Sequence, residues 1–571
     1  MPTVTIDGVQ YEAQAGQTII QVALEHGIDI PHFCWHPGLS VAGNCRMCIV
    51  DVEKIPKPSI ACATTIADGM VVHTQNEKAL KAREDVMEFL LINHPLDCPI
   101  CDEAGQCKLQ DYAFNHSRGE SRFEETKNHK DKRVAFGPNV MFDGERCISC
   151  SRCIRFSQEV AEQPVLTFVQ RGDHVTIQTF PGTQFDNPYS MNVIDICPVG
   201  ALTSRDFRFK ARPWDMSFTE TVCAGCARGC SIRVGVRNNE ILRLEPRPNP
   251  NVNDFWMCDP GRLETYPHVN AEDRVSGAYI RTNGSIQQVS IHDGVHAIAS
   301  GLKKFKPEEI AFVASAFATL EDNYIFLEAA KQRGAKHVGY FEAVSGEDAR
   351  LLMRADKAPN AYSLGLLGIK PFGSDIESQI ASGKIKAVYA LEDDFFSRTH
   401  HLQHAFSKLE FFACHATNMT ATVKAAHVIL PAATWAEKEG VLINFEGWAQ
   451  KLSPAVATAH VVRGFDHLAQ SRLDKFGTPF DKWAQSNKRD AQESWRLAQE
   501  VAKALGGKSD HRYTEDVFEA VAHHYPQLKG LTYDLLGSLG RPLNGIDKPF
   551  KESSYREVYQ LDTIDEIPVL S

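Results

Sequence analysis

Long apolar runs are missing from this 571-residue sequence, in which the densest apolar stretch is a few residues around Phe89 to Ile92. A helix needs about 20 apolar residues to cross a bilayer, so no membrane span is expected. The glycine-rich motifs that seat nicotinamide or ATP, and the serine motif of acyl-transfer enzymes, are also missing. A formal net charge of −11 argues against nucleic acid as a partner.

The first residues, MPTVTIDGVQYEA, carry neither an apolar nor an Arg-rich leader. We therefore expect the chain to stay in a reducing cytosol, where thiolates remain available to metals. With 43% hydrophobic residues the chain can bury several cores, and about three to five domains are expected. Cysteine is unevenly distributed, because fifteen of the sixteen cysteines precede residue 260.

Two sets of candidate metal ligands lie before residue 108. The first has the spacing C-x10-C-x2-C-x13-C: Cys34, Cys45, Cys48 and Cys62. A pair two residues apart can hold one iron while flanking loops supply the other ligands, which indicates a 2Fe-2S cluster. The second contains three cysteines and the nearest residue able to complete a 4Fe-4S cubane: His94, Cys98, Cys101 and Cys107. A neutral imidazole in place of a thiolate removes a negative charge and should raise the potential of that cluster.

Two further sets follow. The third is a triplet closed by a distant cysteine that precedes a proline: Cys147, Cys150, Cys153 and Cys197. Bacterial two-cluster ferredoxins use two such runs, but here Ser157 replaces the fourth cysteine of the triplet's run and no triplet precedes Cys197. One 4Fe-4S cluster is therefore expected. The fourth set, with the spacing C-x2-C-x3-C-x27-C, is sufficient for another 4Fe-4S cluster: Cys223, Cys226, Cys230 and Cys258.

Each set also has a plainer interpretation. Four cysteines can hold structural zinc, and disulfides form in an oxidising compartment. Zinc ribbons are built from two separated pairs, so a triplet such as CISCSRC favours an iron-sulfur cluster. His94 can also be an ordinary histidine at a helix end, because apolar residues at helical spacing precede it and Pro95 follows it. The residues alone leave both roles of His94 open.

Three segments of the chain resemble one protein family: HPLDCPICDEAGQCKLQD, MFDGERCISCSRCIR, and FKARPWDMSF with the CAGCARGC that follows it. Together they resemble the large iron-sulfur subunit in the peripheral arm of respiratory complex I, the NADH:quinone oxidoreductase, over about the first 270 residues. Every ligand position of that family's four clusters is filled here. The resemblance implies that His94 is a ligand, and that the chain carries one 2Fe-2S and three 4Fe-4S clusters.

The four sets of candidate ligands, and the different sequence pattern beyond residue 273, predict a multidomain α+β chain. The hairpin, helix and cluster loops at its start resemble the β-grasp of 2Fe-2S ferredoxins. The predicted domains are a β-grasp 2Fe-2S domain (1–78), a His/Cys-ligated 4Fe-4S domain (79–118), a ferredoxin-like 4Fe-4S domain (119–215), a 4Fe-4S module of the molybdopterin-oxidoreductase type (216–272) and a degenerate molybdopterin-oxidoreductase-like α/β domain without cofactor (273–571).

Local patterns place several elements in these domains. The pair Asp7-Gly8 predicts a tight hairpin turn, and a helix is expected to start near Thr18. A second helix should end at His94, where Pro95 stops it. The hydrophilic stretch 116–133 is expected to be an exposed connection or a surface that faces a partner.

Beyond residue 273, short apolar runs alternate with helical stretches such as 320–331, which predicts a parallel sheet covered by helices. The apolar runs are 310–314, 337–340, 385–391 and 427–430. Residues 425–450 resemble the signature of molybdopterin-containing oxidoreductases such as formate dehydrogenases, in which that segment lines part of the pterin site. Cys414 and His415 mimic the Cys-His pair of formate dehydrogenases, but their position just before this segment favours a structural role for Cys414.

Without a catalytic apparatus of its own, the chain is expected to relay electrons between buried clusters. The resemblance implies that electrons arrive from a flavin subunit that oxidises NADH and leave to quinone-side peripheral subunits, in an order of clusters that spacing cannot give. It also implies a peripheral location on the cytoplasmic side of a bacterial inner membrane.

Three alternatives compete with this interpretation. The molybdenum subunit of an NAD-linked formate dehydrogenase is disfavoured by the missing catalytic residue. An iron-only hydrogenase needs further cysteines that the chain lacks. An assembly scaffold, in which clusters are only structural, is favoured for the C-terminal half alone.

Overall fold

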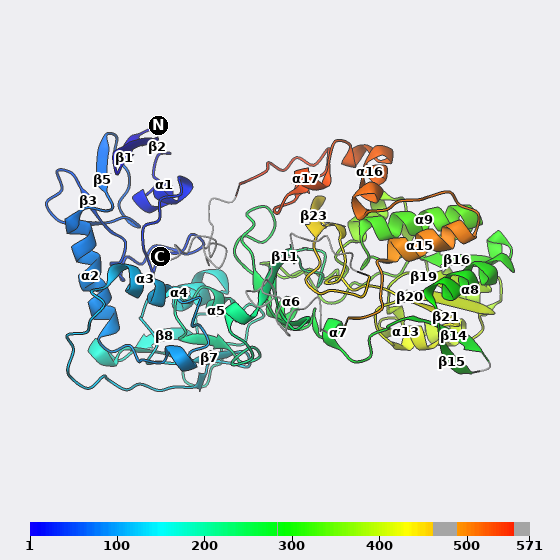
Figure 1. The fold of residues 1–571 in the computed structure, drawn as a ribbon, viewed down its shortest axis with the longest axis horizontal. Helices are drawn as coiled ribbons and strands as arrows, with labels where there is room; N and C mark the ends of the chain where they lie inside the picture. The colour runs from blue at the N-terminus through cyan, green and yellow to red at the C-terminus, as the bar shows by residue number, and fades with distance from the viewer. Residues whose placement is uncertain (283, 461–487, 553–571) are drawn as a thin grey trace, which may run out of the picture. The chain divides into compact units, whose positions relative to one another are not determined.

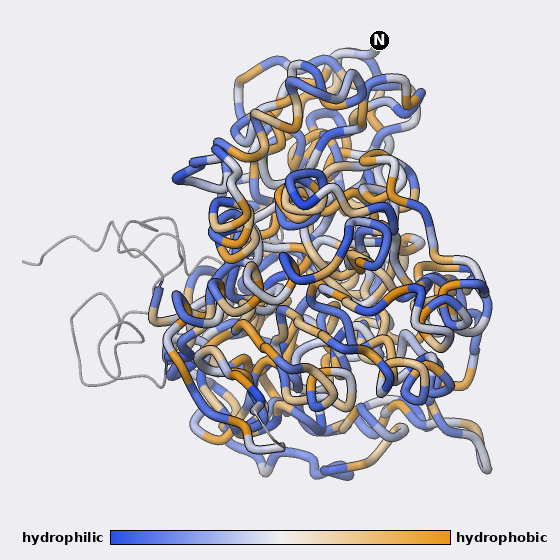
Figure 2. The backbone as a smooth tube through the Cα atoms, turned by 90° about the vertical axis from the view of Figure 1, so that its right-hand side faces the viewer, coloured by the Kyte–Doolittle hydropathy of each residue, from blue (hydrophilic) through white to orange (hydrophobic). Residues whose placement is uncertain are grey.

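The computed structural model describes residues 1–282, 284–460 and 488–552. The chain divides into two compact units, one from Met1 to Trp214, to which Glu552 also belongs, and one from Asp215 to Lys551 (Figure 1). Each unit is described by itself. Apolar and polar stretches alternate over short distances along the backbone (Figure 2). Among the described residues, no helix combines the length and apolar character that crossing a bilayer requires.

The first unit opens with a five-stranded mixed sheet. Its first hairpin turns at Asp7 and Gly8, both of which have positive φ (47° and 87°), as predicted. Thr18 is the N-cap of α1 (Ile19–Glu25), also as predicted, and the helix buries its apolar face. The strand order is β2-β1-β5-β3-β4, with β1 (Thr3–Ile6), β2 (Val9–Glu12), β3 (Ile49–Val52), β4 (Ser59–Ile60) and β5 (Met70–His73).

The long helix α2 (Glu77–Leu91) follows this sheet. The prediction that it ends at His94 was wrong by three residues, because Lys127 donates hydrogen bonds to the carbonyl oxygens of Leu91 (3.0 Å) and Ile92 (2.7 Å) and so caps the helix earlier. The predicted exposed connection at 116–133 is largely exposed, but this capping and an ion pair between Arg122 and Glu88 (2.6 Å) tether it to α2.

The rest of the first unit is made of short elements joined by long loops, which is where the cysteines lie. Two small antiparallel sheets are present, β10-β7-β6 and β8-β9. Their strands are β6 (Val134–Ala135), β7 (Val140–Phe142), β8 (Leu166–Val169), β9 (Thr176–Thr179) and β10 (Leu202–Ser204). The helical turns are η1 (Cys98–Ile100), α3 (Lys108–His116), α4 (Arg152–Arg155), the π-helical η2 (Phe156–Val160) and α5 (Asn192–Asp195).

The second unit begins with a three-stranded antiparallel sheet, β11-β12-β13, and two short helices. These elements are β11 (Ser217–Val222), β12 (Ser231–Arg237), β13 (Glu240–Pro246), α6 (Asp259–Leu263) and α7 (Pro267–Asn270). The buried faces of the strands carry apolar residues such as Ile232, Val234 and Leu244, which explains why this small sheet persists between loops rich in cysteine and asparagine.

An eight-stranded sheet forms the centre of the second unit, in the order β15-β14-β21-β20-β19-β16-β17-β18. Its six strands from β16 to β21 pair in parallel, as predicted, and β14 with β15 adds an antiparallel edge. The strands are β14 (Ala278–Thr282), β15 (Ser285–Val289), β16 (Ile310–Val313), β17 (His337–Tyr340), β18 (Lys370–Pro371), β19 (Ala387–Ala390), β20 (Phe411–Ala416) and β21 (Val428–Pro431).

Helices cover both faces of this sheet, so alternate residues of one strand enter different cores. In β16, Phe312 packs into one apolar cluster with residues of α9, while Ala311 and Val313 pack into the other. The helices of this unit are α8 (Ile291–Lys303), α9 (Leu320–Arg333), α10 (Ala361–Leu366), α11 (Asp375–Ala381), α12 (Leu402–Phe406), α13 (Ala421–Lys424), α15 (Ser494–Ala504), α16 (Thr514–His524) and α17 (Tyr533–Leu536) (Figure 1). A separate small sheet contains β22 (Gly440–Ile443), β23 (Trp448–Leu452) and β24 (Arg541–Pro542).

Candidate iron-sulfur sites

The first set of cysteines lies on loops around β3 and β4. Cys34 comes after α1, Cys45 and Cys48 precede β3, and Cys62 follows β4. Hydrogen bonds join the thiols, Cys34 with Cys45 and Cys62, and Cys62 with Cys48. The bond from Cys45 lowers the pKa of Cys34, and the bond from Cys62 lowers the pKa of Cys48. The same bonds raise the pKa of Cys45 and Cys62. The structure therefore brings this predicted set together.

All four members of the third set line one small cavity of about 20 Å³: Cys147, Cys150, Cys153 and Cys197. Between the first three, Ser149 and Ser151 adopt left-handed φ angles of 54° and 65°, a strained backbone that persists where its surroundings hold it. The backbone N–H of Ser149 donates to Cys147 Sγ at 3.4 Å. Ser157, at the position of the missing fourth cysteine, is buried and donates to the carbonyl oxygen of Ile154 at 2.8 Å.

The fourth set lines a larger cavity of about 540 Å³ in the second unit: Cys223, Cys226, Cys230 and Cys258. The Sγ of Cys258 accepts a hydrogen bond from the backbone N–H of Gly261 at 3.3 Å. A Cβ atom on Gly261 would lie 3.0 Å from Cys258 Sγ and 3.5 Å from Cys223 Sγ. Glycine at this position therefore leaves room for the sulfurs and for what they bind.

The second set lies between α2 and α3. Burial lowers the pKa of His94 to about 4, so its imidazole is neutral near pH 7, the form that binds metals. Cys98 is exposed in η1, while Cys101 and Cys107 are buried. Burial also raises the pKa of Cys107 to about 12, so a bound cation is needed to hold it as a thiolate at neutral pH. Ligation by His94 stays a prediction.

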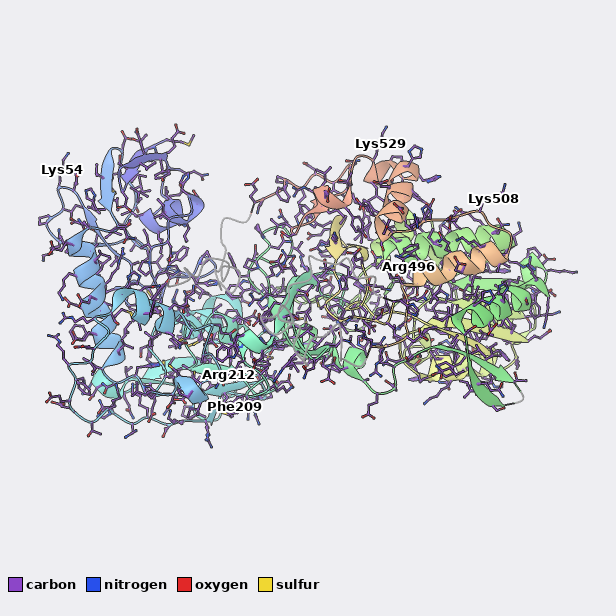
Figure 3. The ribbon with its side chains drawn as sticks, in the orientation of Figure 1. Lys54, Phe209, Arg212, Arg496, Lys508 and Lys529 are labelled. Carbon is purple, nitrogen blue, oxygen red and sulfur yellow. The ribbon has the colours of Figure 1, made fainter. Side chains whose placement is uncertain are left out.

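The FKARPW segment, noted in the sequence only as a resemblance, packs on the loop of the second set. Arg212 is labelled in Figure 3. Its guanidinium donates hydrogen bonds to the carbonyl oxygens of Cys101 and, at 2.5 Å, Pro99. The ring of Trp214 lies so close to Gly105 that a Cβ there would sit 2.6 Å from a ring carbon. Sequence reasoning missed these two positioning residues because 111 residues separate Arg212 from Cys101.

The third set lies against the first. From the helix that carries Cys153, Arg155 donates to the carbonyl oxygen of Cys34, and Arg152 donates to that of Trp35 at 2.5 Å. A bond also runs from the first set to the third: the Asn44 side-chain amide, next to Cys45, donates to the carbonyl oxygen of Ser149 at 3.0 Å. Loops that hold the two sets are therefore bonded to each other directly.

The third set also lies against the second. A Cβ atom on Gly200, three residues after Cys197, would sit only 2.2 Å from Cys101 Sγ. The Sγ of Cys107 lies 4.0 Å from the carbonyl oxygen of Pro198. The segment that closes the third set is therefore in contact with two cysteines of the second, and the third set lies between the other two.

All four donor sets fit iron-sulfur clusters by their chemistry, and two of them also have space beside the sulfurs. Two of the sets line cavities with all four cysteines, and glycines stand where a Cβ would strike the sulfurs. Within the described ranges, no three or more His, Cys, Asp or Glu side chains are arranged to hold a single metal ion. The assignment of clusters to the four sets stays a prediction.

Cys414 lies apart from every set. Its side chain is in β20, 3% exposed, within the apolar cluster that contains Phe412 and Val388. Burial raises its pKa to about 12, so the thiol stays protonated. It does not line the 540 Å³ cavity that contains the fourth set. These observations support the structural role predicted for it.

Five family models match the chain in order: 2Fe-2S iron-sulfur cluster binding domain (residues 1–77), NADH-ubiquinone oxidoreductase-G iron-sulfur binding region (83–122), NADH-quinone oxidoreductase subunit 3, ferredoxin-like domain (137–203), Molybdopterin oxidoreductase Fe4S4 domain (216–264) and Molybdopterin oxidoreductase (296–463). The fold and these matches define an iron-sulfur protein in which 2Fe-2S and 4Fe-4S domains precede a molybdopterin-oxidoreductase-like domain.

The resemblance to the large iron-sulfur subunit of complex I is confirmed by individual relatives. An NADH-quinone oxidoreductase subunit from Rickettsia felis is 41% identical over 338 residues, 59% of this chain and 50% of the relative. The NADH-ubiquinone oxidoreductase 75 kDa subunit of Reclinomonas americana is 41% identical over 345 residues, 60% of this chain and 49% of the relative. The chain thus spans about half the length of the curated relatives it matches.

Proposed function

We propose that this chain is the electron-relay iron-sulfur subunit of a proton-pumping NADH:quinone oxidoreductase. In this role it takes electrons from a flavin subunit that oxidises NADH and passes them to quinone-side peripheral subunits. The chain is then part of an enzyme without a complete active site of its own. Its place is peripheral, on the cytoplasmic side of a bacterial inner membrane. The main support for the proposal is that direct contacts join the Cys34 set to the Cys147 set, and the Cys147 set to the His94 set, within the first unit.

The proposed cofactors are one 2Fe-2S cluster on the Cys34 set, three 4Fe-4S clusters on the His94, Cys147 and Cys223 sets, and no molybdopterin. Such clusters each take up and release one electron. The chain's own residues fix the positions and potentials of these centres. Arg152 and Arg155 place positive charge between the first and third sets, and a neutral His94 removes a negative charge from the second.

The contacts support an order of transfer from the Cys34 set through the Cys147 set to the His94 set. The third set contacts both of the others, through Arg155 on one side and Gly200 on the other. An electron that enters at either end then passes through the middle set. The resemblance supplies the direction, since the flavin subunit delivers electrons and quinone lies beyond the relay.

Metal analysis of the intact protein tests the cofactors. We expect about 14 irons per chain and no zinc, because one 2Fe-2S and three 4Fe-4S clusters contain that many irons. About ten irons with one zinc would show that the Cys223 set is a zinc site.

The order is tested in the assembled complex with Cys147→Ala. NADH should still reduce the cluster of the Cys34 set but no longer that of the His94 set, as followed by electron paramagnetic resonance after rapid freezing. Dithionite should reduce both, which controls for loss of the His94 cluster itself. Normal reduction of the His94 cluster by NADH in this variant would contradict the order.

A further inference from the structure

The 540 Å³ cavity that contains the fourth cysteine set lies at the carboxyl edge of the parallel sheet. Its lining includes residues that follow four of the strands: Phe317 after β16, Glu392 to Asp394 after β19, Thr417 after β20 and Thr434 after β21. The chain order reverses between β16 and β19, since β17 and β18 continue on one side and β20 and β21 on the other. Ligands of open α/β sheets bind at such a reversal point.

Glu392 is held on the wall of this cavity in an unusual conformation. Its φ is 33°, a left-handed value that non-glycine residues seldom adopt. Its backbone N–H donates to the carbonyl oxygen of His415 (3.1 Å), and its own carbonyl accepts from the Ser315 hydroxyl (3.2 Å). Neighbouring segments on both sides therefore fix a strained residue on the wall of the cavity that the Cys223 set also lines, and such strain concentrates at functional sites.

The side chain of Glu392 belongs to a buried network with an uncompensated negative charge. Lys438 Nζ lies 2.7 Å from a carboxylate oxygen of Glu392 and 2.7 Å from one of Asp322, and the side chains of Lys438, Glu392 and Asp322 are 1%, 5% and 0% exposed. Within the described ranges, Lys438 is the one cation in ion-pair contact with either carboxylate. Two carboxylates thus share one ammonium, and a proton would make the network neutral.

The two carboxylates differ in their hydrogen-bond partners. The Asp322 carboxylate also accepts the backbone N–H groups of Trp495 (2.8 Å) and Thr319 (3.1 Å). The Glu392 carboxylate instead accepts from Lys438 Nζ at both oxygens (2.8 and 2.7 Å). Burial raises the pKa of Glu392 to about 7, although Lys438 opposes the shift.

Other partners hold the neighbouring acidic groups. Asp393 is bound by both oxygens to Arg398 (2.8 Å each), which opposes the rise of its pKa on burial to about 6, and Asp394 accepts from the Thr422 hydroxyl at 2.6 Å. Burial lowers the pKa of His415 on β20 to about 3, so this imidazole is neutral. Glu392 is therefore the group beside the cavity that is best placed to gain a proton.

We propose that Glu392 takes up a proton when the cluster of the Cys223 set gains an electron, so that this cavity is a proton-coupled redox site. This inference rests on the proposed function, because it requires a cluster on that set. An external one-electron reductant is oxidised and the cluster is reduced, while a proton from water forms an O–H bond at a Glu392 carboxylate oxygen. When an external one-electron oxidant takes that electron from the cluster, the O–H bond breaks and the proton returns to solvent.

Redox titrations of the full cluster-loaded chain test the coupling, with the Cys223 signal obtained by subtracting the spectrum of Cys258→Ser. Above about pH 7, where Glu392 is ionised before reduction, we expect the potential of this cluster to fall as pH rises, by up to about 59 mV for each tenfold fall in proton concentration. Glu392→Gln should remove the slope. Glu321→Gln is the matched control and should keep it, because Glu321 is a buried carboxylate bonded to Val441 and Tyr533 that does not line the cavity.

Infrared difference spectra of the wild-type chain provide a second readout that needs no variant to fold. Reduction should produce a carboxylic acid band, and that band should be missing in Glu392→Gln. A cluster with a potential independent of pH, an unchanged slope in Glu392→Gln, or no acid band on reduction would overturn the inference alone. A Cys223 set that holds zinc would overturn the proposed cofactors as well, and the iron count distinguishes these outcomes.

Discussion

Replacing Gly200 by alanine should remove the second cluster without unfolding the chain. The Cβ atom added there would lie 2.2 Å from Cys101 Sγ and 2.9 Å from Glu103 Cβ, closer than Cβ atoms approach other heavy atoms in proteins. Gly200 does not have a left-handed φ, so alanine meets no backbone strain and the effect is purely steric. One of the two contacting segments must therefore move.

The segment of Cys101 should be the one that moves. Beside Gly200, the carbonyl oxygen of Ala201 accepts from the backbone N–H of Asp143 at 2.8 Å, and the carbonyl oxygen of Val199 accepts from the backbone N–H of Ala201 at 2.8 Å. The exposed turn η1 before Cys101 has no buried residue. Overpacking of this kind costs about 1–3 kcal/mol, which is a tolerable loss of stability but enough to displace a ligand.

Iron analysis and electron paramagnetic resonance check this prediction. Gly200→Ala should lower the iron content from about 14 to about 10 per chain and remove the signal of the His94 cluster. The control is Gly365→Ala in α10, where no atom lies within 4 Å of the added Cβ and φ is not left-handed. It should keep all clusters and raise stability by about 0.5–1 kcal/mol. Full iron content in Gly200→Ala would refute the contact between the second and third sets.

Four other predictions follow from the sites. His94→Cys should keep its cluster and lower the potential measured by redox titration, because a thiolate adds negative charge; an unchanged potential would mean that His94 is not a ligand. Cys258→Ala should spare NADH:quinone turnover per assembled complex, whereas Cys147→Ala should abolish it. Equal losses of turnover would place the fourth set on the electron-transfer path from NADH to quinone. The purified complex should contain no molybdenum and should not oxidise formate; stoichiometric molybdenum in mass spectrometry would revive the formate dehydrogenase alternative. Lys438→Met should lower the free energy of unfolding at pH 7 by about 3–5 kcal/mol in denaturant titrations, because it leaves buried carboxylates unpaired. This loss should shrink as the pH falls toward the pKa values of the carboxylates in the unfolded chain, where they become protonated. A loss that does not depend on pH would contradict the charge argument.

Elements set by local sequence could be predicted well. The Asp7-Gly8 turn, the start of α1 at Thr18 and the parallel strands between residues 310 and 431 depend on a few neighbouring residues and on short apolar runs. Cys197 was grouped with the Cys147, Cys150 and Cys153 triplet, which ends 44 residues earlier, because ferredoxins show that pattern. All four cysteines line one cavity in the structure. These predictions needed no knowledge of how separate loops meet.

The order of the sets could not be predicted, because it depends on contacts between distant segments. The sequence around Arg152 and Arg155 does not indicate their partners, which are backbone carbonyls 117 and 121 residues earlier, and both side chains are buried. The end of α2 was misplaced for a similar reason, since the lysine that caps it comes 36 residues later. No periodicity in the sequence encodes such hydrogen bonds.

The second unit stays folded for reasons that are separate from its cavity. Its sheet is buried on both faces by two apolar clusters, which supply the driving force for folding whether or not the cavity is filled. Burying Lys438 with two carboxylates adds little to that stability, because removing charges from water costs about as much as their attraction returns. A strained Glu392 at the cavity wall costs further free energy. Packing alone therefore does not account for this network, and a role in proton uptake beside the Cys223 set does.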